Sequence, residues 1–430
     1  MRVDVAPFLS GLGLSAILVA VMYNHFLPSP GGLNVVDILA LVLPLIAALL
    51  LLSGSKVALP LHGQAGLLLL FVGGIYYIFL AGIFVFTDTL GRASVQILAA
   101  NMRYFIAAVL VLCSVVFFQR LRNPVNFLMI AIFLLMIPHF IAAAQQGATV
   151  YLGIGSPSDW IYVPERREGV HLTWSVAGFA DNQFTLAAIG LFVASFALAA
   201  LFGTSNLTQN QRLIFFLLFA MGAICIILTA RRVQTLALFA MLLVLFIYSI
   251  RKSSSPQKVL MSVVRFMLVG LVVFSVFAWL SQYTSRFNAF GAMLSGSDDP
   301  SLRTYDLRLA QIDIFLENIT NNPFGTLAFP TGLGFFGGDL SFLSQWLWGG
   351  VPGALFYVLL HVAFAVSAYK VLSKSEKGSE DFAALFMLLI AVGFFVRALG
   401  SGGGLQVPSN FLYWVAVGCF LSFSAVKQKS

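Results

Sequence analysis

The chain has 430 residues, of which 60% are hydrophobic and only 9% are charged. A soluble globular domain has about 25% charged residues, so this composition excludes an ordinary soluble protein and indicates an integral membrane protein. The net charge of +8 comes from cations scattered over short connections, unlike the clustered cations of a nucleic-acid-binding surface. We therefore expect a lipid bilayer as the surroundings of this chain and no nucleic-acid partner.

Apolar stretches of about 20 residues recur along the whole chain, and each is long enough to cross a bilayer. Every backbone polar group in lipid needs an internal partner, so these stretches are expected to be helices. The sequence predicts an all-α polytopic membrane protein that forms a single domain, residues 1–430, with about twelve transmembrane helices. Their predicted ranges are 7–27, 35–52, 63–87, 103–118, 124–145, 183–203, 213–230, 233–250, 259–281, 342–369, 382–399 and 408–426.

The distribution of lysine and arginine predicts the orientation. One set of alternate connections, which includes both termini, contains every lysine, whereas the other set contains arginines only. Because cytoplasmic loops carry the excess of positive charge, both termini are predicted to be cytoplasmic. Two long connections, 146–182 and 282–341, then lie on the outer, periplasmic face. Apolar residues recur at helical spacing over 309–319, which predicts an amphipathic helix on that surface.

The segment LTARRVQTLAL, residues 228–238, places Arg231 and Arg232 inside a long apolar run. They divide the run into pieces that are each about 27 Å long as a helix, so they mark a tight hairpin at a membrane face. Counting the predicted membrane crossings from the cytoplasmic N-terminus places this hairpin on the outer face. Either the arginines extend to lipid headgroups, or they bind an anionic group, since a planar guanidinium suits phosphate oxygens. Arg397, near the outer end of the helix at 382–399, either extends to the headgroups or lines a cavity that opens to the outer leaflet.

Asp339 follows the glycine-rich segment GLGFFG, residues 332–337, in the second outer loop. This segment matches G-x-G-x-x-G, but no strand precedes it and no βαβ unit surrounds it, so a dinucleotide site is rejected. Asp339 has two compatible interpretations. It is the N-cap of the helix that begins near residue 342, or it is a general base at the mouth of an outer-leaflet cavity.

Four segments resemble, in order, parts of the O-antigen ligase and polysaccharide polymerase family. SVAGFADNQFTLAAI (175–189) resembles a G-x-F-x-x-x-N-x-x-A segment that opens a span, and LTARRVQTLAL resembles L-T-x-S-R-x-x-x-L. DPSLRTYDLRLAQIDIFLENITNNPFGTLAFPTGLG (299–334) resembles the large external loop of that family, in which an arginine precedes a helix that ends in an N-P-x-G turn. Arg308 matches that arginine. GGDLSFLSQWLWGGVPGALFYVLL (337–360) resembles the stretch that re-enters the membrane.

The resemblance implies a GT-C-like, metal-independent glycosyltransferase in the bacterial inner membrane. Its donor would be an oligosaccharide on undecaprenyl pyrophosphate, with no cofactor, and its candidate protein partners would be a chain-length regulator and a flippase. Outer arginines would hold the pyrophosphate, and a loop residue would activate the acceptor hydroxyl. The candidate catalytic residues are Asp339 and Arg308. The candidate substrate-binding residues are Arg231, Arg232, Arg303, Arg397 and Asn182, and no metal site is expected.

The ligase type carries a histidine where this chain has Asp339, and no histidine lies between His171 and His361. An aspartate there resembles the polymerase type, so we predict a polymerase that joins polysaccharide repeat units. The alternative is an O-antigen ligase that transfers finished glycan to lipid A core. An alternative from another class is a secondary transporter, but the acidic residues avoid the span centres and no internal repeat is visible.

Overall fold

The computed structural model describes most of the predicted helices and little of the two long loops. The described residues are 5–27, 35–52, 63–87, 95–156, 167–168, 171–172, 176–180, 182–229, 231–253, 255–257, 341–374, 379–399 and 411–424, with isolated positions between 260 and 317. Apart from turns and short loops, these ranges are helical, and they include one small antiparallel hairpin, in which β1 (Arg167–Glu168) pairs with β2 (His171–Leu172).

The first half of the chain contains α1 (Val5–Met22), a short 3-10 helix η1 (Asn24–Phe26), α2 (Val35–Leu52), α3 (Gln64–Thr87), α4 (Val95–Arg120) and α5 (Pro124–Leu152). The second half contains α6 (Gln183–Gly203), α7 (Gln209–Leu228), α8 (Arg232–Arg251), α12 (Ser341–Lys374), α13 (Ser379–Ala398) and α14 (Phe411–Ser424). Within the described ranges, eight helices are long and apolar enough to cross a membrane, and three further apolar helices are shorter. This is the architecture of a polytopic α-helical membrane protein.

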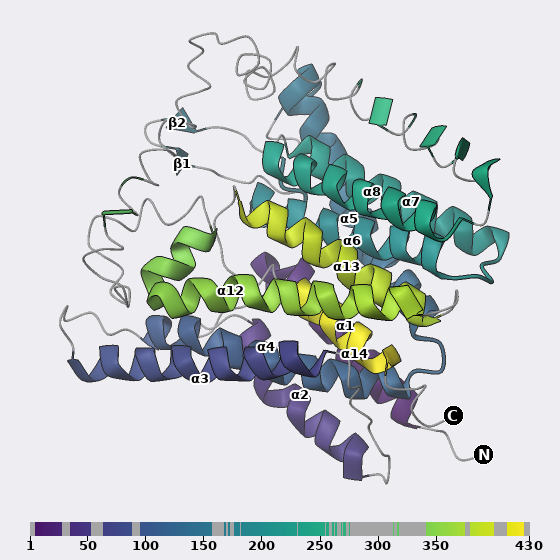
Figure 1. Cartoon of the computed structure of the whole chain (residues 1–430). Helices are drawn as coiled ribbons and strands as arrows, with labels where there is room; N and C mark the ends of the chain where they lie inside the picture. Colours follow the sequence, from purple (N-terminus) through teal and green to yellow (C-terminus); the bar gives the residue numbers. More distant parts are fainter. Residues whose placement is uncertain are drawn as a thin grey trace.

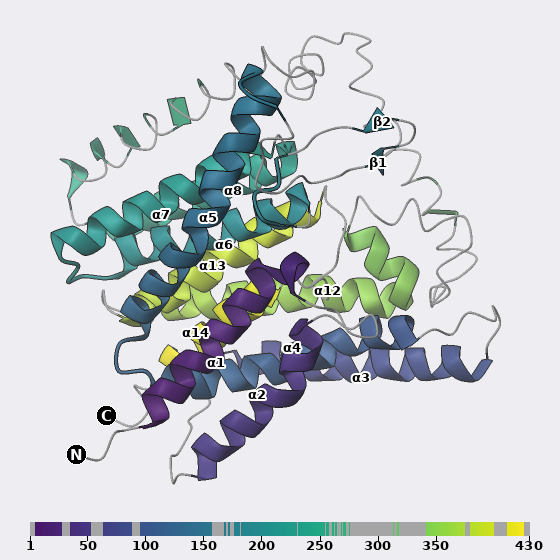
Figure 2. The same cartoon turned by 180° about the vertical axis from the view of Figure 1, so that it is seen from behind.

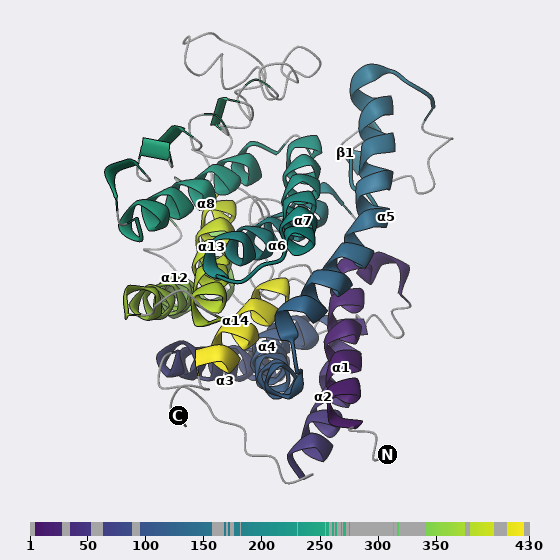
Figure 3. The same cartoon turned by 90° about the vertical axis from the view of Figure 1, so that its right-hand side faces the viewer.

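The helices pack into one bundle (Figures 1 and 2). α6 contacts α7 and α13, and α13 also contacts α8, α12 and α14. On the other side, α3 packs on α4, and α4 packs on α14, α1 and α2, so the C-terminal helix joins the two halves of the bundle. Seen from the side in Figure 3, α7 and α8 form an outer layer over α6 and α13.

The burial pattern places α6 inside the bundle. Of its most apolar window, 89% is buried inside the protein, whereas 33% of that of α7 is buried. Phe196 of α6 packs edge-on against Phe215 of α7 and against Phe382 and Phe386 of α13. The outer face of α7 exposes large apolar side chains, including Phe216 at 59%. An apolar outer face of this kind is matched to lipid.

Two glycines allow α6 and α7 to approach closely. A Cβ atom on Gly222 would lie 2.8 Å from the backbone oxygen of Gly190. A Cβ atom on Gly190 would likewise lie 2.8 Å from the backbone oxygen of Gly222. Small residues at such crossings bring helix backbones together in membrane proteins. The chain therefore fixes the α6–α7 contact through backbone packing.

Gly222→Leu should separate α6 from α7 and lower the thermal unfolding midpoint of the purified protein by several degrees. The physical reason is overpacking, which costs about 1–3 kcal/mol in a well-packed interior. Gly82→Leu is the matched control, because a Cβ atom on Gly82 of α3 meets nothing within 4 Å. Equal unfolding midpoints for the two variants would contradict the close packing described for α6 and α7.

The predicted ranges at 35–52 and 183–203 coincide with α2 and α6, but α4 and α5 are longer than predicted. α4 begins at Val95 rather than at 103, and α5 ends at Leu152 rather than at 145. The apolar part of α4 begins at Met102, as predicted, and the neighbouring Arg103 guanidinium forms an ion pair of 3.3 Å with the buried carboxylate of Asp37 on α2. A paired cation does not end a helix, so α4 extends past it.

The helix predicted at 342–369 is broken near its start. α12 runs from Ser341 to Lys374 but has non-helical backbone at Gly350, with φ 64° and ψ −160°. Glycine tolerates this conformation, and Pro352 removes a backbone donor at the same point. The membrane-spanning part is therefore Gly349–Lys374, preceded by a short helix set at an angle (Figure 1). The helices predicted at 259–281 and 309–319 lie almost entirely outside the described residues.

Candidate functional site

The α7–α8 hairpin forms where the sequence predicts it. α7 ends at Leu228 and α8 begins at Arg232, so Arg231 occupies the N-cap position of α8. The backbone of this turn is well anchored. The Tyr151 hydroxyl of α5 donates to the Leu228 carbonyl at 2.6 Å, and the Thr235 hydroxyl donates to the Arg231 carbonyl at 3.2 Å. The arginine pair thus stands on a fixed turn.

The Arg231 side chain packs onto another helix. Its guanidinium carbon lies 3.9 Å from the centre of the Phe184 ring, which is in the first turn of α6. A cation over an aromatic face at this distance is attracted by the ring quadrupole. The side chain is half-buried. The contact holds the guanidinium against α6, and the two interpretations of Arg231 stay predictions.

Arg397 reaches the same residue from α13. Its side chain is buried, at 4% exposure, and its Nη2 donates to the Phe184 backbone oxygen at 3.4 Å. The guanidinium carbon also lies 5.5 Å from the centre of the Phe394 ring. The charged head of Arg397 therefore lies inside the protein, unlike that of a snorkelling side chain, and its role in a site stays a prediction.

Asn182 caps α6 at the same place. Its Oδ1 accepts hydrogen bonds from the Phe184 and Thr185 amides at 2.9 Å and 3.0 Å. The position of Asn182 is therefore explained by helix capping. Its Nδ2 is the group that could donate to an anion. Two guanidinium groups and a helix N-terminus, which carries partial positive charge, thus meet around one residue.

A short loop before α6 is held by α5. The buried Gln146 side chain accepts hydrogen bonds from the Ala177 and Gly178 amides at 2.9 Å and 2.8 Å and donates to the Gly178 carbonyl at 3.1 Å. The Phe179 amide donates to Nδ1 of His139 at 3.3 Å. Residues 176–180 are consequently fixed against α5, and they lead directly into the cap of α6.

Tyr23, just after α1, packs against the part of α5 that holds this loop. Its ring lies 4.6 Å from the His139 ring, centre to centre, and its hydroxyl donates to the Leu135 carbonyl at 2.7 Å. Burial raises the pKa of Tyr23 to about 12, so the hydroxyl remains a donor at all physiological pH values. Tyr23 is therefore a structural support for the loop.

Gly178→Ala should destabilise the protein more than Gly153→Ala. Both glycines have positive φ, at 58° and 65°, so alanine is strained at each by roughly 1 kcal/mol. A Cβ atom on Gly178 would also lie 2.9 Å from the His139 backbone oxygen, whereas a Cβ atom on Gly153 meets nothing within 4 Å. Thermal unfolding of the two variants measures the difference. Identical midpoints would contradict the close contact between the loop and α5.

The structure thus brings together three of the predicted site residues, Asn182, Arg231 and Arg397. The backbone of Arg232 begins α8, and its side chain lies outside the described residues. Arg303, Arg308 and Asp339 also lie outside the described residues, so their predicted roles stay predictions. Within the described ranges, no three His, Cys, Asp or Glu side chains gather closely enough to hold a metal ion.

Comparison with known proteins assigns no family. No protein-family model matches the chain, and no curated protein matches it. A functional assignment therefore depends on the residues themselves and on the resemblance in the order of the motifs.

Three residues near the arginines were not predicted as part of the site. Phe184 carries both arginine contacts, and Gln146 holds the loop. Gln234, one turn after Arg231 on α8, is 1% exposed, and its Nε2 has no hydrogen-bond partner within the described part of the chain. A glutamine buried in an apolar helix is unusual, so the glutamines at 146 and 234 were the available sequence signals.

Proposed function

We propose that this protein is a polysaccharide repeat-unit polymerase of the inner membrane. It crosses the membrane twelve times with both termini in the cytoplasm, and it transfers glycan from a polyprenyl pyrophosphate to an acceptor sugar hydroxyl on the periplasmic face. The observation that carries this proposal is the meeting of Arg231 and Arg397 on Phe184, at the N-terminus of α6. Such an arrangement suits a pyrophosphate group held at a membrane surface.

The chemistry needs a stabilised leaving group. The acceptor oxygen attacks the anomeric carbon, the bond from that carbon to the pyrophosphate oxygen breaks, and the polyprenyl pyrophosphate leaves with the bonding electrons. Negative charge then grows on the pyrophosphate, and guanidinium groups already in place stabilise it. The acceptor proton passes to a base, for which Asp339 is the proposed residue.

The lipid tail of the donor also determines from which side the donor must reach the arginines. The polyprenyl tail must remain in lipid while the pyrophosphate reaches the arginines. α7 and α8 form an outer layer of the bundle (Figure 3), and near the hairpin they expose apolar side chains such as Ile224 of α7 and Leu236 of α8. A donor tail lying against this apolar surface would stay in the outer leaflet while its headgroup reaches the Arg231 end of the hairpin.

The glycan profile of a deletion strain tests the proposal. Glycans are separated by size and by lipid carrier. The polymerase predicts that long chains disappear, while single repeat units remain on the normal acceptor. Long chains that accumulate on the polyprenyl carrier and never reach lipid A would instead identify a ligase. An unchanged profile, together with uptake of labelled glycan into vesicles, would identify a transporter.

A further inference from the structure

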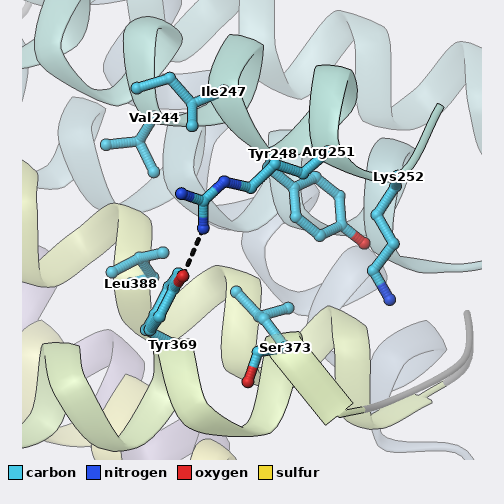
Figure 4. Close-up of a pocket in the computed structure, with 9 residues that line it drawn as sticks. Val244, Ile247, Tyr248, Arg251, Lys252, Tyr369, Ser373 and Leu388 are labelled. Carbon is cyan, nitrogen blue, oxygen red and sulfur yellow. Dashed lines mark hydrogen bonds between the residues drawn. The ribbon is translucent and has the colours of Figure 1, made fainter.

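A cavity lies at the opposite end of α8 from Arg231. It has a volume of about 540 Å³ and is lined by residues of α8, α12 and α13 (Figure 4). This volume is in the range of sites for small molecules. α8 has 20 residues and is therefore about 30 Å long, one hydrocarbon thickness. The cavity is thus on the other membrane face from the arginine site, and a role for it does not depend on the proposed function.

The cavity has an apolar half and a polar half. Val244 and Ile247 of α8 and Leu388 of α13 line the apolar half. Ile247 is 47% exposed, so this half opens towards the outside of the bundle. Arg251 and Lys252 line the polar half together with Tyr369 of α12. Figure 4 shows the Arg251 side chain reaching towards Tyr369, while the Lys252 side chain points away on the other side of Tyr248. The apolar wall lies one to two turns before the cations on the same helix.

One of the two cations is balanced by an acidic group. Lys252 Nζ lies 3.4 Å from the Asp381 carboxylate, which is fully buried and also accepts a hydrogen bond from the Tyr248 hydroxyl at 3.0 Å. This network joins α8 to α13 and fixes one wall of the cavity. Among the described residues that line the cavity, Arg251 is then the cation whose charge an additional anion would balance.

Arg251 crosses the cavity from α8 to α12. Its guanidinium donates a hydrogen bond to the Tyr369 hydroxyl and lies 5.5 Å from the centre of that ring. The hydroxyl and the ring are neutral, so they position the guanidinium without balancing its charge. A guanidinium has five donors, and one hydrogen bond to a hydroxyl leaves its fork able to engage an oxyanion.

We propose that this cavity binds an anionic phospholipid. The phosphodiester sits against Arg251, and one acyl chain lies against Val244, Ile247 and Leu388. The order of the groups along α8 carries this assignment, because cations stand at the helix end, where headgroups lie, and apolar side chains stand deeper. A free anion would leave the apolar half unused. Basic pockets between transmembrane helices recognise lipid headgroups in this way.

Native mass spectrometry of the whole protein in detergent tests this site. Phosphatidylglycerol should be retained in preference to phosphatidylcholine with the same acyl chains. Arg251→Gln should weaken phosphatidylglycerol binding about fivefold, the effect of one cation near a lipid headgroup. Ile247→Trp should weaken it too, because the larger side chain fills the apolar half while both cations remain.

Arg212→Gln is the matched control, because Arg212 lies at the start of α7, on the same membrane face and away from the cavity. This variant should retain phosphatidylglycerol like the original protein. Unchanged binding in Arg251→Gln or in Ile247→Trp, or equal retention of phosphatidylcholine, would overturn the proposal. So would displacement of phosphatidylglycerol by inorganic phosphate at equal concentration, which would identify a site for a free anion.

Discussion

Arg231→Ala should reduce glycan transfer about 100-fold or more, the usual effect of removing one preorganised group that stabilises transition-state charge. The alanine variant loses the guanidinium that lies over Phe184 but keeps the backbone turn, which is held by Tyr151 and Thr235. Insertion and thermal unfolding should therefore change little. The measurement is transfer from a polyprenyl-pyrophosphate-linked oligosaccharide by the purified variant in vesicles.

Arg231→Lys separates charge from geometry. Lysine retains the positive charge but lacks the planar fork, so it should not restore transfer if the pyrophosphate is held by paired hydrogen bonds. Arg212→Ala removes an arginine from the opposite end of the hairpin and serves as the control with full transfer. Full transfer by Arg231→Ala would exclude this residue from the site.

Gln146→Leu should both destabilise the protein and reduce transfer. Leucine is similar in size but cannot pair with the Ala177 and Gly178 amides, which the glutamine binds at 2.9 Å and 2.8 Å. Buried backbone groups left without partners cost about 1–3 kcal/mol each, so a loss near 3 kcal/mol is expected. The released loop would no longer fix the start of α6, and with it the position of Phe184 between the two arginines.

Thermal unfolding and transfer assays on the same preparation measure both effects. Gln209→Leu is the control, since Gln209 is exposed in the first turn of α7 and should tolerate leucine. A Gln146→Leu variant that unfolds early yet transfers normally would show that the loop supports stability alone. Normal stability would contradict the buried hydrogen bonds themselves.

The apolar periodicity predicts the helices well because lipid imposes the same requirement on each of them. α2 and α6 have the predicted bounds, and the hairpin at Arg231 is where two charged residues interrupt an apolar run. The predicted span at 103–118 matches the apolar part of α4, Met102–Arg120, but the polar start of that helix at Val95 was not predicted. Arg103 lies inside α4, and its partner Asp37 belongs to another helix.

The candidate site also combines features that local sequence predicts with features that depend on how the helices pack. Arg231 and Arg397 were identified as charged residues near predicted helix ends, and Asn182 from the resemblance of residues 175–189 to a family segment; both signals are local. Their common contact with Phe184 depends on how α6, α8 and α13 pack, and no local pattern encodes that packing. Phe184 is one of 42 phenylalanines in the chain, so its sequence position gave no signal. Gln146 stands out only because it is a buried amide in an apolar helix.

The most direct test of the proposed function uses the purified protein in vesicles with a single substrate, a repeat unit on polyprenyl pyrophosphate. Products are followed by glycan size and by release of the free polyprenyl pyrophosphate. A polymerase should produce a ladder of longer glycans, with one carrier molecule released for each unit added, and neither product with Arg231→Ala. Carrier release without longer glycans, or no release from a folded protein, would contradict a polymerase.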